Sequence, residues 1–376
     1  STRRRQRQMC IRDSYRTTAY QFNNTEHAAN LFGLKEFGNI YSRLGNPTVG
    51  ALEARLTALE DGAMCVALSS GTSAVMYSLI NIMSQGDNFV TANQLYGGTY
   101  TMFDNILPEY GINSKKVDIT DFEAVESAID EKTRAIYCET ITNPGLVVAD
   151  ISALADIAHS KGIPLIVDAT FTTSAILKPF EFGADIVVYS LTKWMSGHGR
   201  VIAGAVIEKG GFDWGNGNFP LYDKPDTSYG GMRWGHDLGD LGNVAYSLRL
   251  RTVPLRNLGA NMSPDTAFEV LSGLETLALR MERHCENAIK AAEYLSGHEL
   301  VEWVRFPGLK DDPAYNLSEK YLKGTGGTMV VFGIKGGKDA GQKFIDNLKM
   351  FRHVANVGDT RSLAIHPATT THSQLD

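Results

Sequence analysis

A lysine follows a predicted buried strand in the segment Asp185–Gly199, which reads DIVVYSLTKWMSGHG. The apolar, β-branched run in this segment ends at Tyr189, so Lys193 stands at or just past the end of a strand. A buried ammonium group is costly unless it is paired or neutralised. Forming an imine with a carbonyl compound is one way to neutralise it. Most single lysines are solvated surface residues, so the interpretation of Lys193 depends on the other strand ends.

Two further turns that follow predicted strands carry small, hydroxylated or aromatic residues. Ser69–Ser73 joins a strand to a helix, and its backbone N–H groups would point at the helix N-terminus, where anions bind. A simple helix cap at Ser70 is the alternative. Tyr96 follows the next strand and is placed to project over a ligand, although a packing tyrosine with a satisfied hydroxyl is commoner.

A carboxylate and two hydroxyl groups complete the set. Asp168 ends the apolar run Leu165–Val167, where a buried carboxylate needs a partner. The ring nitrogen of pyridoxal phosphate is one such partner, and a ring nitrogen kept protonated by an aspartate makes the ring an electron sink. The hydroxyl groups of Ser190 and Thr192 can bind a phosphate. Together with Lys193, these residues predict a pyridoxal phosphate site.

Two competing interpretations of the glycine-rich turns fail. A Rossmann dinucleotide site needs Gly-x-Gly-x-x-Gly after the first strand, and a P-loop needs Gly-Lys-Ser/Thr after a glycine-rich turn. The chain has neither motif at those places. The Asn143-Pro144 turn after another strand holds Asn143 extended, but Asn-Pro is also a frequent ordinary turn.

The composition is that of a globular protein and excludes several function classes. The 376 residues suggest two domains. A net charge of −6 argues against nucleic acid or an anionic membrane as the main partner. The four cysteines lack metal-ligand spacing, so no metal is expected and a cytoplasmic location is predicted. No apolar run is long enough to span a membrane.

Short apolar strands alternate with helices through the first half of the chain. This pattern predicts an α/β fold, a mostly parallel sheet with helices on both faces and ligands at the carboxyl ends of the strands. The expected strands are Ala63–Leu68, Asn88–Ala92, Arg134–Cys138, Ile163–Val167, Ile186–Tyr189 and Val201–Ile207. The expected helices are Thr48–Leu59, Ser73–Met83, Gly97–Glu109, Asp121–Ile129 and Ile151–Lys161.

The second half is expected to differ. Gly210–Gly259 has little periodicity and is expected to pass over the active site. Pro264–Leu295 is strongly periodic and is expected to form one long helix that bridges two domains. A smaller C-terminal α+β unit should contain strands near Val301–Arg305, Thr328–Phe332 and His353–Val357 and a helix at Ala340–Leu348.

These patterns predict four regions. Residues 1–14 are arginine-rich without periodicity and are expected to be a non-native leader. Residues 15–47 are predicted to form an extended N-terminal arm, and residues 48–272 a large cofactor-binding domain. Residues 273–376 are predicted to form a small domain that is truncated at its C-terminus.

The chain resembles the Cys/Met-metabolism family of pyridoxal-phosphate enzymes, which have the fold type I transferase architecture. The family includes cystathionine synthases and lyases, methionine γ-lyase and O-acetylhomoserine sulfhydrylase. The resemblance covers nearly the whole chain from about Tyr15. Its motifs are Tyr41-Ser42-Arg43, Asn46-Pro47-Thr48, Ser70-Gly71-Thr72, Leu95-Tyr96-Gly97-Gly98-Thr99, Asp168, Ser190-Leu191-Thr192-Lys193, Gly197-His198-Gly199 and His366-Pro367-Ala368-Thr369.

The resemblance implies three catalytic residues. Lys193 matches the lysine that forms the imine and moves protons, and Asp168 matches the partner of the ring nitrogen. Tyr96 matches the tyrosine stacked on the ring, beside the substrate. The matches to phosphate-binding residues are Ser70, Gly71, Thr72, Ser190 and Thr192.

Other matches concern the surroundings of the cofactor. Tyr41 and Arg43 match residues that reach the phosphate of a neighbouring subunit, which implies a dimer as the minimal active unit and a homotetramer as the expected assembly. Glu139 and Asn143 match residues near the ring hydroxyl group. Ser362 falls in the substrate-side loop.

Within the family, several segments are similar to those of O-acetylhomoserine sulfhydrylases. This similarity implies replacement of the γ-acetoxy group of O-acetyl-L-homoserine by sulfide or methanethiol, giving homocysteine or methionine plus acetate. Methionine γ-lyases usually carry a cysteine where Gly98 stands. The segments similar to those of O-acetylhomoserine sulfhydrylases are Asn30–Leu34, Trp214–Pro220, Tyr229–Gly231 and Gly259–Pro264. Methionine γ-lyase and cystathionine γ-synthase or lyase activities remain alternatives, as does a cofactor-binding fragment with little turnover.

Three departures from the family pattern bear on activity. Ala169 stands where an asparagine is usual, which is expected to loosen the surroundings of the cofactor. Leu191 is bulky where a small residue is usual. The family arginine that binds the substrate carboxylate lies beyond Asp376, so the chain is expected to bind the cofactor but to turn over weakly.

Overall fold

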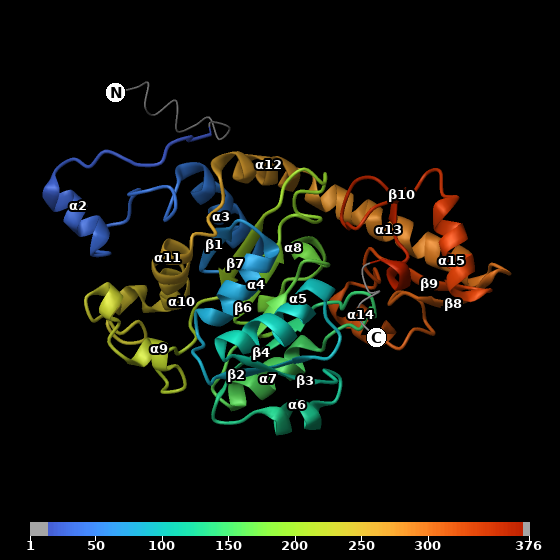
Figure 1. The fold of residues 1–376 in the computed structure, drawn as a ribbon, viewed down its shortest axis with the longest axis horizontal. Coiled ribbons are helices and arrows are strands. Elements are labelled where there is room, and N and C mark those ends of the chain that lie inside the picture. The colour runs from blue at the N-terminus through green and yellow to red at the C-terminus, as the bar shows by residue number, and fades with distance from the viewer. Residues whose placement is uncertain (1–13, 371–376) are drawn as a thin grey trace.

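A seven-stranded sheet forms the centre of the molecule (Figure 1). The computed structural model describes residues 14–370, so most of the expected leader lies outside the described residues. The strand order is β1-β7-β6-β5-β4-β2-β3, and only β7 runs antiparallel to its neighbours. The strands are β1 (Met64–Leu68), β2 (Asn88–Ala92), β3 (Asn113–Val117), β4 (Thr133–Glu139), β5 (Leu165–Asp168), β6 (Ile186–Ser190) and β7 (Gly204–Glu208). The expected mostly parallel α/β sheet is therefore confirmed.

Helices pack directly on this sheet. Among their closest contacts are those of α3 with β1, α4 with β6 and β7, and α7 with β4 and β5. The helices up to residue 258 are α2 (Thr25–Phe32), α3 (Pro47–Glu60), α4 (Gly71–Ile80), α5 (Gly97–Thr101), α6 (Phe122–Ala128), α7 (Ile151–Ser160), α8 (Thr173–Ile176), α9 (Pro220–Asp223), α10 (Ala245–Leu250) and α11 (Arg256–Leu258). Because the central strands are apolar and fully buried on both sides, they give the sheet its core.

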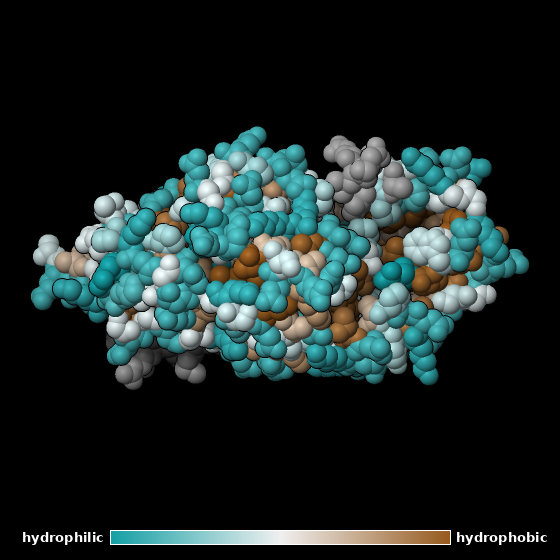
Figure 2. Space-filling model, turned by 90° about the horizontal axis from the view of Figure 1, so that it is seen from below, coloured by the Kyte–Doolittle hydropathy of each residue, from teal (hydrophilic) through white to brown (hydrophobic). Residues whose placement is uncertain are grey.

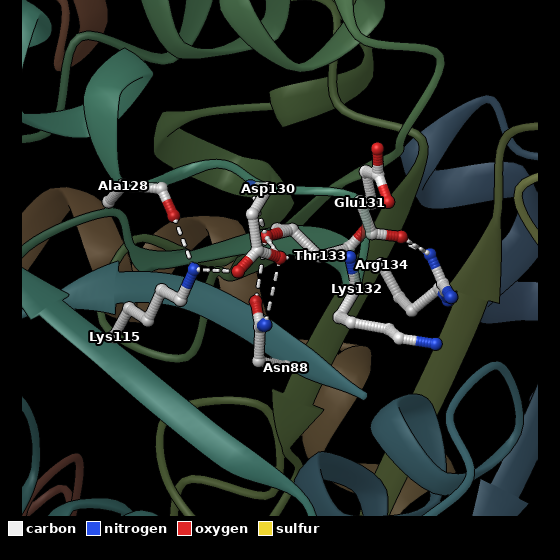
Figure 3. Close-up of polar contacts among 8 residues, drawn as sticks. All are labelled: Asn88, Lys115, Ala128, Asp130, Glu131, Lys132, Thr133 and Arg134. Carbon is white, nitrogen blue, oxygen red and sulfur yellow. Dashed lines mark hydrogen bonds and ion pairs between the residues drawn. The ribbon is translucent and has the colours of Figure 1, made fainter. Parts of the chain in front are cut away.

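Strand β3 does not follow from the apolar pattern. It reads NSKKV and is polar because it lies at the edge of the sheet, beside β2. Lys115 on this strand donates to the Ala128 carbonyl oxygen at 2.8 Å and to Asp130 at 2.6 Å, and Asp130 also accepts from Asn88 on β2 at 3.0 Å (Figure 3). These bonds attach the edge strand near the end of the sheet where β2 and β4 begin.

The segment Gly210–Gly259 does not pass over the active site, and that expectation is wrong. Most of its aromatic side chains are buried, and Trp214 stacks on Tyr222 and Tyr246 with ring centroids 5.1 Å apart in each pair. Asn81 at the end of α4 donates to the Tyr222 hydroxyl group. The segment is irregular because it covers α4 and the β1–β7 side of the sheet as a packed aromatic layer.

The expected single helix over Pro264–Leu295 is two helices, α12 (Pro264–Leu274) and α13 (Leu277–Ser296). Glu275 and Thr276 separate the two helices. Beyond α13, the described elements are β8 (Val301–Arg305), α14 (Tyr315–Tyr321), β9 (Val331–Ile334), α15 (Gly337–Asp346), β10 (Arg352–His353) and β11 (Leu363–Ala364). The strand expected at His353–Val357 is wrong beyond His353, because the chain turns there toward Lys193.

Residues 14–46 run outward from the body as the blue segment of Figure 1, which includes α2. The base of this arm is tied down by Asn46, which caps α3 with its side chain and donates to the Tyr15 carbonyl oxygen. Arg251 donates to the Leu44 carbonyl oxygen at 2.6 Å. The division into arm, large domain and small domain stays a prediction.

Candidate active site

A cavity of about 2780 Å³ opens between the carboxyl ends of the central strands and the C-terminal elements. Figure 2 shows brown apolar side chains around the hollow between the main body and the C-terminal lobe. Most of the residues expected at the site line this cavity. They are Ser70, Gly71, Thr72, Tyr96, Glu139, Asn143, Asp168, Ser190, Thr192, Lys193 and Ser362.

Lys193 lies in the turn just after β6, as expected from its position behind a buried strand. Its amine donates to the Asn356 Oδ1 atom at 2.7 Å. Burial lowers the pKa of the Lys193 amine, which favours the neutral nucleophile. The turn therefore presents a lysine whose ammonium form is destabilised.

A loop of the C-terminal part, residues 354–362, docks on this turn. The Thr360 N–H donates to the Gly197 carbonyl oxygen at 3.0 Å. A Cβ atom added at Gly358 would lie 2.5 Å from the Trp194 nitrogen, so only glycine fits this contact without movement. The loop therefore reaches Lys193 by close backbone packing and places Asn356 on its amine.

Arg280 on α13 holds the same turn from another side. Its guanidinium group donates to the Trp194 carbonyl oxygen and to the Gly273 carbonyl oxygen at the end of α12, both at 2.6 Å. The sequence alone does not predict that Arg280 and Asn356 lie at this turn. Each meets the lysine turn only through tertiary folding, and neither stands in a local motif.

Asp168 ends β5 and faces the cavity. Its Oδ1 atom accepts from the Thr170 N–H at 2.9 Å, while its Oδ2 atom has the Tyr137 hydroxyl group at 3.4 Å. Burial raises the pKa of the Asp168 carboxyl group against the lowering effect of these bonds. Because the contact with Tyr137 is long, the Oδ2 atom can still accept a shorter hydrogen bond from another donor.

Glu139 ends the neighbouring strand β4 and stands in register with Asp168. Its Oε1 atom accepts from the Tyr96 N–H at 2.8 Å. Burial, and then the charge of Asp168, raise the pKa of the Glu139 carboxyl group well above its ordinary value. The Tyr96 side chain is 49% exposed within the cavity.

The turn before α4 forms a close cradle with β6. The Ser70 hydroxyl group accepts from the Ser73 N–H at 3.0 Å. The N–H groups of Gly71 and Thr72 belong to the first turn of α4, where backbone N–H groups have no acceptor within the helix. A Cβ atom at Gly71 would lie 2.5 Å from the Cβ atom of Ser190. The glycine therefore lets the N-terminus of α4 pack directly against β6, so that Gly71, Thr72 and Ser190 line the same part of the cavity, where an anion can be bound.

Three expected residues stand apart from this cradle. The Thr192 hydroxyl group donates to the Ala203 carbonyl oxygen at 3.2 Å and accepts from the Ala203 N–H at 3.0 Å, so a phosphate would compete with these bonds. Tyr41 and Arg43 lie on the arm, outside the cavity of their own chain. The Arg43 guanidinium group lies 5.3 Å from the centroid of the Tyr41 ring.

Comparisons with known proteins agree with this geometry. The family model described as "Cys/Met metabolism PLP-dependent enzyme" matches residues 1–376. The chain is 47% identical to O-acetyl-L-homoserine sulfhydrylase of Leptospira meyeri over 96% of this chain and 83% of that protein. It is also 47% identical to O-acetyl-L-homoserine sulfhydrylase 1 of Thermus thermophilus, over 96% of this chain and 86% of that protein.

A solved structure has the same fold and carries the cofactor. A crystal structure from Campylobacter jejuni, described as an O-acetylhomoserine (thiol)-lyase with a pyridoxyl-lysine monophosphate residue, matches with a TM-score of 0.93 at 40% identity. The match covers 97% of this chain and 86% of that chain. With its lysine after β6, its carboxylate at the end of β5 and these relatives, the chain belongs to the Cys/Met metabolism family of PLP-dependent enzymes.

Proposed function

We propose that the chain catalyses γ-replacement on O-acetyl-L-homoserine, with sulfide or methanethiol as the incoming nucleophile. The Cγ–O bond breaks, a Cγ–S bond forms, and acetate leaves with homocysteine or methionine as the other product. The observation that carries this proposal is that Lys193, Asp168 and the N-terminus of α4 line one cavity in a chain 47% identical to O-acetyl-L-homoserine sulfhydrylases.

The residues present fit pyridoxal phosphate. Gly71, Thr72 and Ser190 line the cavity where α4 packs on β6, and their N–H and hydroxyl groups can bind a phosphate. The Oδ2 atom of Asp168 can accept from a protonated ring nitrogen. Lys193 supplies the amine. When bound, the cofactor supplies the electron sink that lets the substrate carbons lose protons.

The protein groups then have separate tasks. Asp168, which is held in place by the Thr170 N–H, would keep the ring nitrogen protonated, because its negative charge favours the protonated form. Lys193 would move protons between substrate carbons, and its lowered pKa favours the neutral amine that accepts a proton. The exposed ring of Tyr96 lines the cavity and would stack on the cofactor, and Ser362, which lines the same cavity, would face the substrate.

The proposal extends to assembly and location. Tyr41 and Arg43 lie outside the cavity of their own chain, which supports a dimer with shared sites and a homotetramer built from such dimers. A cytoplasmic location is supported by Cys65, Cys138 and Cys285, which are buried and free. No helix within residues 14–370 is long and apolar enough to cross a membrane.

An assay of acetate and keto-acid release tests the activity. The wild-type chain loaded with pyridoxal phosphate should release acetate from O-acetyl-L-homoserine only when sulfide or methanethiol is present. Lys193→Ala should abolish this release and the absorbance of the lysine-bound cofactor. Lys290→Ala, at a surface lysine paired with Glu286 on α13, is the control and should behave as wild type.

Other outcomes identify the alternatives. Keto-acid and ammonia release without a thiol would identify a lyase instead. Cofactor absorbance with no acetate release under either condition would leave a cofactor-binding protein without this activity, and would overturn the proposal.

A further inference from the structure

Glu139 lines the cavity and is buried, with only 5% of the residue exposed. Its carboxyl group accepts hydrogen bonds from backbone N–H groups. The Oε1 atom accepts the Tyr96 N–H at 2.8 Å, and the Asn143 N–H also donates to the carboxylate. One carboxylate at the end of β4 therefore joins two loops that both line the cavity.

The start of α5, where Tyr96 stands, lacks a side-chain cap. Tyr96 is the N-cap residue of α5, and its side chain makes no capping hydrogen bond. The two residues that follow are Gly97 and Gly98, which leave the backbone free to rotate. α5 continues into a π-helix at Met102–Ile106 and a 3₁₀ helix at Leu107–Tyr110, and the Tyr100 N–H donates to the Tyr96 carbonyl oxygen at 2.9 Å, but these helical bonds leave the Tyr96 N–H unused. The Tyr96 N–H is therefore held from outside the helix, by the Glu139 carboxyl group.

The ring of Tyr96 is placed by the same local structure. A Cβ atom at Gly98 would lie 2.7 Å from the Tyr96 Cε1 atom, so the ring folds back over this glycine. The Gln94 side chain also packs against Gly145 of the neighbouring loop. The ring position thus depends on how the loop before α5 is seated against the end of β4.

We infer that Glu139 is a positioning residue that sets the Tyr96 ring over the cofactor by holding the Tyr96 N–H. This inference rests on the proposed function, since it assigns Glu139 a task at the proposed cofactor site. The expected place of Glu139 near the ring hydroxyl group stays a prediction. Asp168 takes the cofactor nitrogen, whereas its register neighbour Glu139 acts through protein backbone.

A carboxylate suits this task better than an amide. Both oxygen atoms of a carboxylate accept hydrogen bonds, so one side chain can serve the N–H groups of both loops. A glutamine at this position could accept with only one atom and would turn its NH₂ group toward the other N–H donor. Glu139→Gln should therefore be intermediate between the wild type and Glu139→Ala.

The experiment compares Glu139→Ala, Glu139→Gln, Tyr96→Ala and the double variant Tyr96→Ala/Glu139→Ala. Two quantities are measured, amide hydrogen exchange of residues 93–101 in the cofactor-bound protein and the dissociation constant of pyridoxal phosphate. We expect Glu139→Ala to speed exchange and weaken cofactor affinity about tenfold, as loss of a buried hydrogen bond does. In the Tyr96→Ala background, the same change should alter the affinity less than about twofold.

Glu208→Ala is the matched control. Glu208 also ends a strand, is buried, and accepts a backbone N–H, that of Ser247, at 2.8 Å, but it lies outside the cavity. It should lower thermal stability while leaving cofactor affinity unchanged.

Three results would overturn the inference. They are multiplicative effects of Tyr96→Ala and Glu139→Ala on affinity, unchanged exchange at residues 93–101, and equal loss of affinity in Glu208→Ala. If Glu139→Ala does not fold, Glu139→Gln alone and in the Tyr96→Ala background decides. Absence of acetate release in the wild type would instead count against the proposed function, and the exchange measurement would still test the contact.

Discussion

At the scale of single residues, the reactive amine is controlled by a partner from the far end of the chain. Lys193 and Asn356 are separated by 163 positions in sequence, yet their side chains meet at 2.7 Å. An amide oxygen stabilises an ammonium group, while burial destabilises it. Asn356 therefore opposes part of the effect of burial on Lys193.

Substitution of Asn356 should shift the titration of Lys193 in opposite directions. Asn356→Asp places a carboxylate beside the amine and should raise the Lys193 pKa, whereas Asn356→Ala removes the acceptor and should lower it. The pH dependence of reductive methylation at Lys193 in the cofactor-free protein, followed by mass spectrometry, measures both. Equal midpoints in the two variants would contradict the contact.

The buried carboxyl group of Glu60 predicts a pH effect on stability. Burial raises the pKa of Glu60 from 4.5 to about 7, although its Oε1 atom accepts from the Tyr189 hydroxyl group. Since the folded-state value is the higher one, the contribution of Glu60 is fully present below pH 4.5 and is lost as the pH rises through 7.

Glu60→Gln should flatten this dependence. The neutral side chain should reduce the fall in the free energy of unfolding between pH 5 and pH 8 by roughly 2–3 kcal/mol, as the shift implies. Urea unfolding at several pH values measures it. Glu282→Gln on an exposed position of α13 is the control, and parallel pH curves for Glu60→Gln and the control would refute the prediction.

At the scale of elements, the polar strand β3 pairs with β2 along its length and is also held by side chains at the start of the parallel strands. The hydrogen bond from Lys115 is the largest of the causes that lower the pKa of Asp130, ahead of the one from Asn88. The same carboxylate accepts from Thr133 at the start of β4 (Figure 3). Asp130 thereby links β2, β3 and β4.

Lys115→Ala should destabilise the protein by about 1 kcal/mol at neutral pH, a small effect because the pair is partly exposed. The contribution of a carboxylate with a lowered pKa is present above its ordinary value of 3.8 and is lost as the pH falls below it. The difference from wild type should therefore shrink in acid. Lys132→Ala, whose side chain points away from Asp130 in Figure 3, is the control for chemical denaturation. A difference that grows in acid would contradict this account.

The elements that could be predicted are those whose burial shows in their sequence. Strands β4, β5 and β6 are apolar runs and were expected, whereas β3 is polar and was not. The break between α12 and α13 could not be predicted, because the apolar periodicity continues across Glu275. Irregular aromatic stretches such as Trp214–Pro220 carry no signal of whether they cover a site or a core.

The site could be predicted where its residues follow strands directly. Asp168 and Lys193 come at strand ends, and the carboxyl ends of parallel strands meet at one edge. Asn356 and Arg280 could not be predicted, since their contacts with the lysine turn span 163 and 86 positions. The assignment of each expected residue to the cofactor stays a proposal.

At the scale of the whole molecule, the arm offers residues that its own cavity does not use. Its base is anchored by Asn46 and by the bond from Arg251 to Leu44, while Tyr41 and Arg43 are exposed. An anchored arm with an exposed arginine suits a two-fold dimer, in which each copy contributes the same residue to the site of the other.

Mixed dimers test this arrangement directly. Lys193→Ala and Arg43→Ala subunits should each be nearly inactive alone, but a hybrid has one site with both Lys193 and Arg43 intact. Random exchange should therefore restore acetate release to about a quarter of the wild-type rate, since half the dimers are hybrids with one complete site each. Native mass spectrometry measures the hybrid fraction, and mixing Lys193→Ala with Lys193→Ala/Arg43→Ala is the control that should restore nothing. Hybrids that form without restored activity would show that Arg43 serves only its own chain.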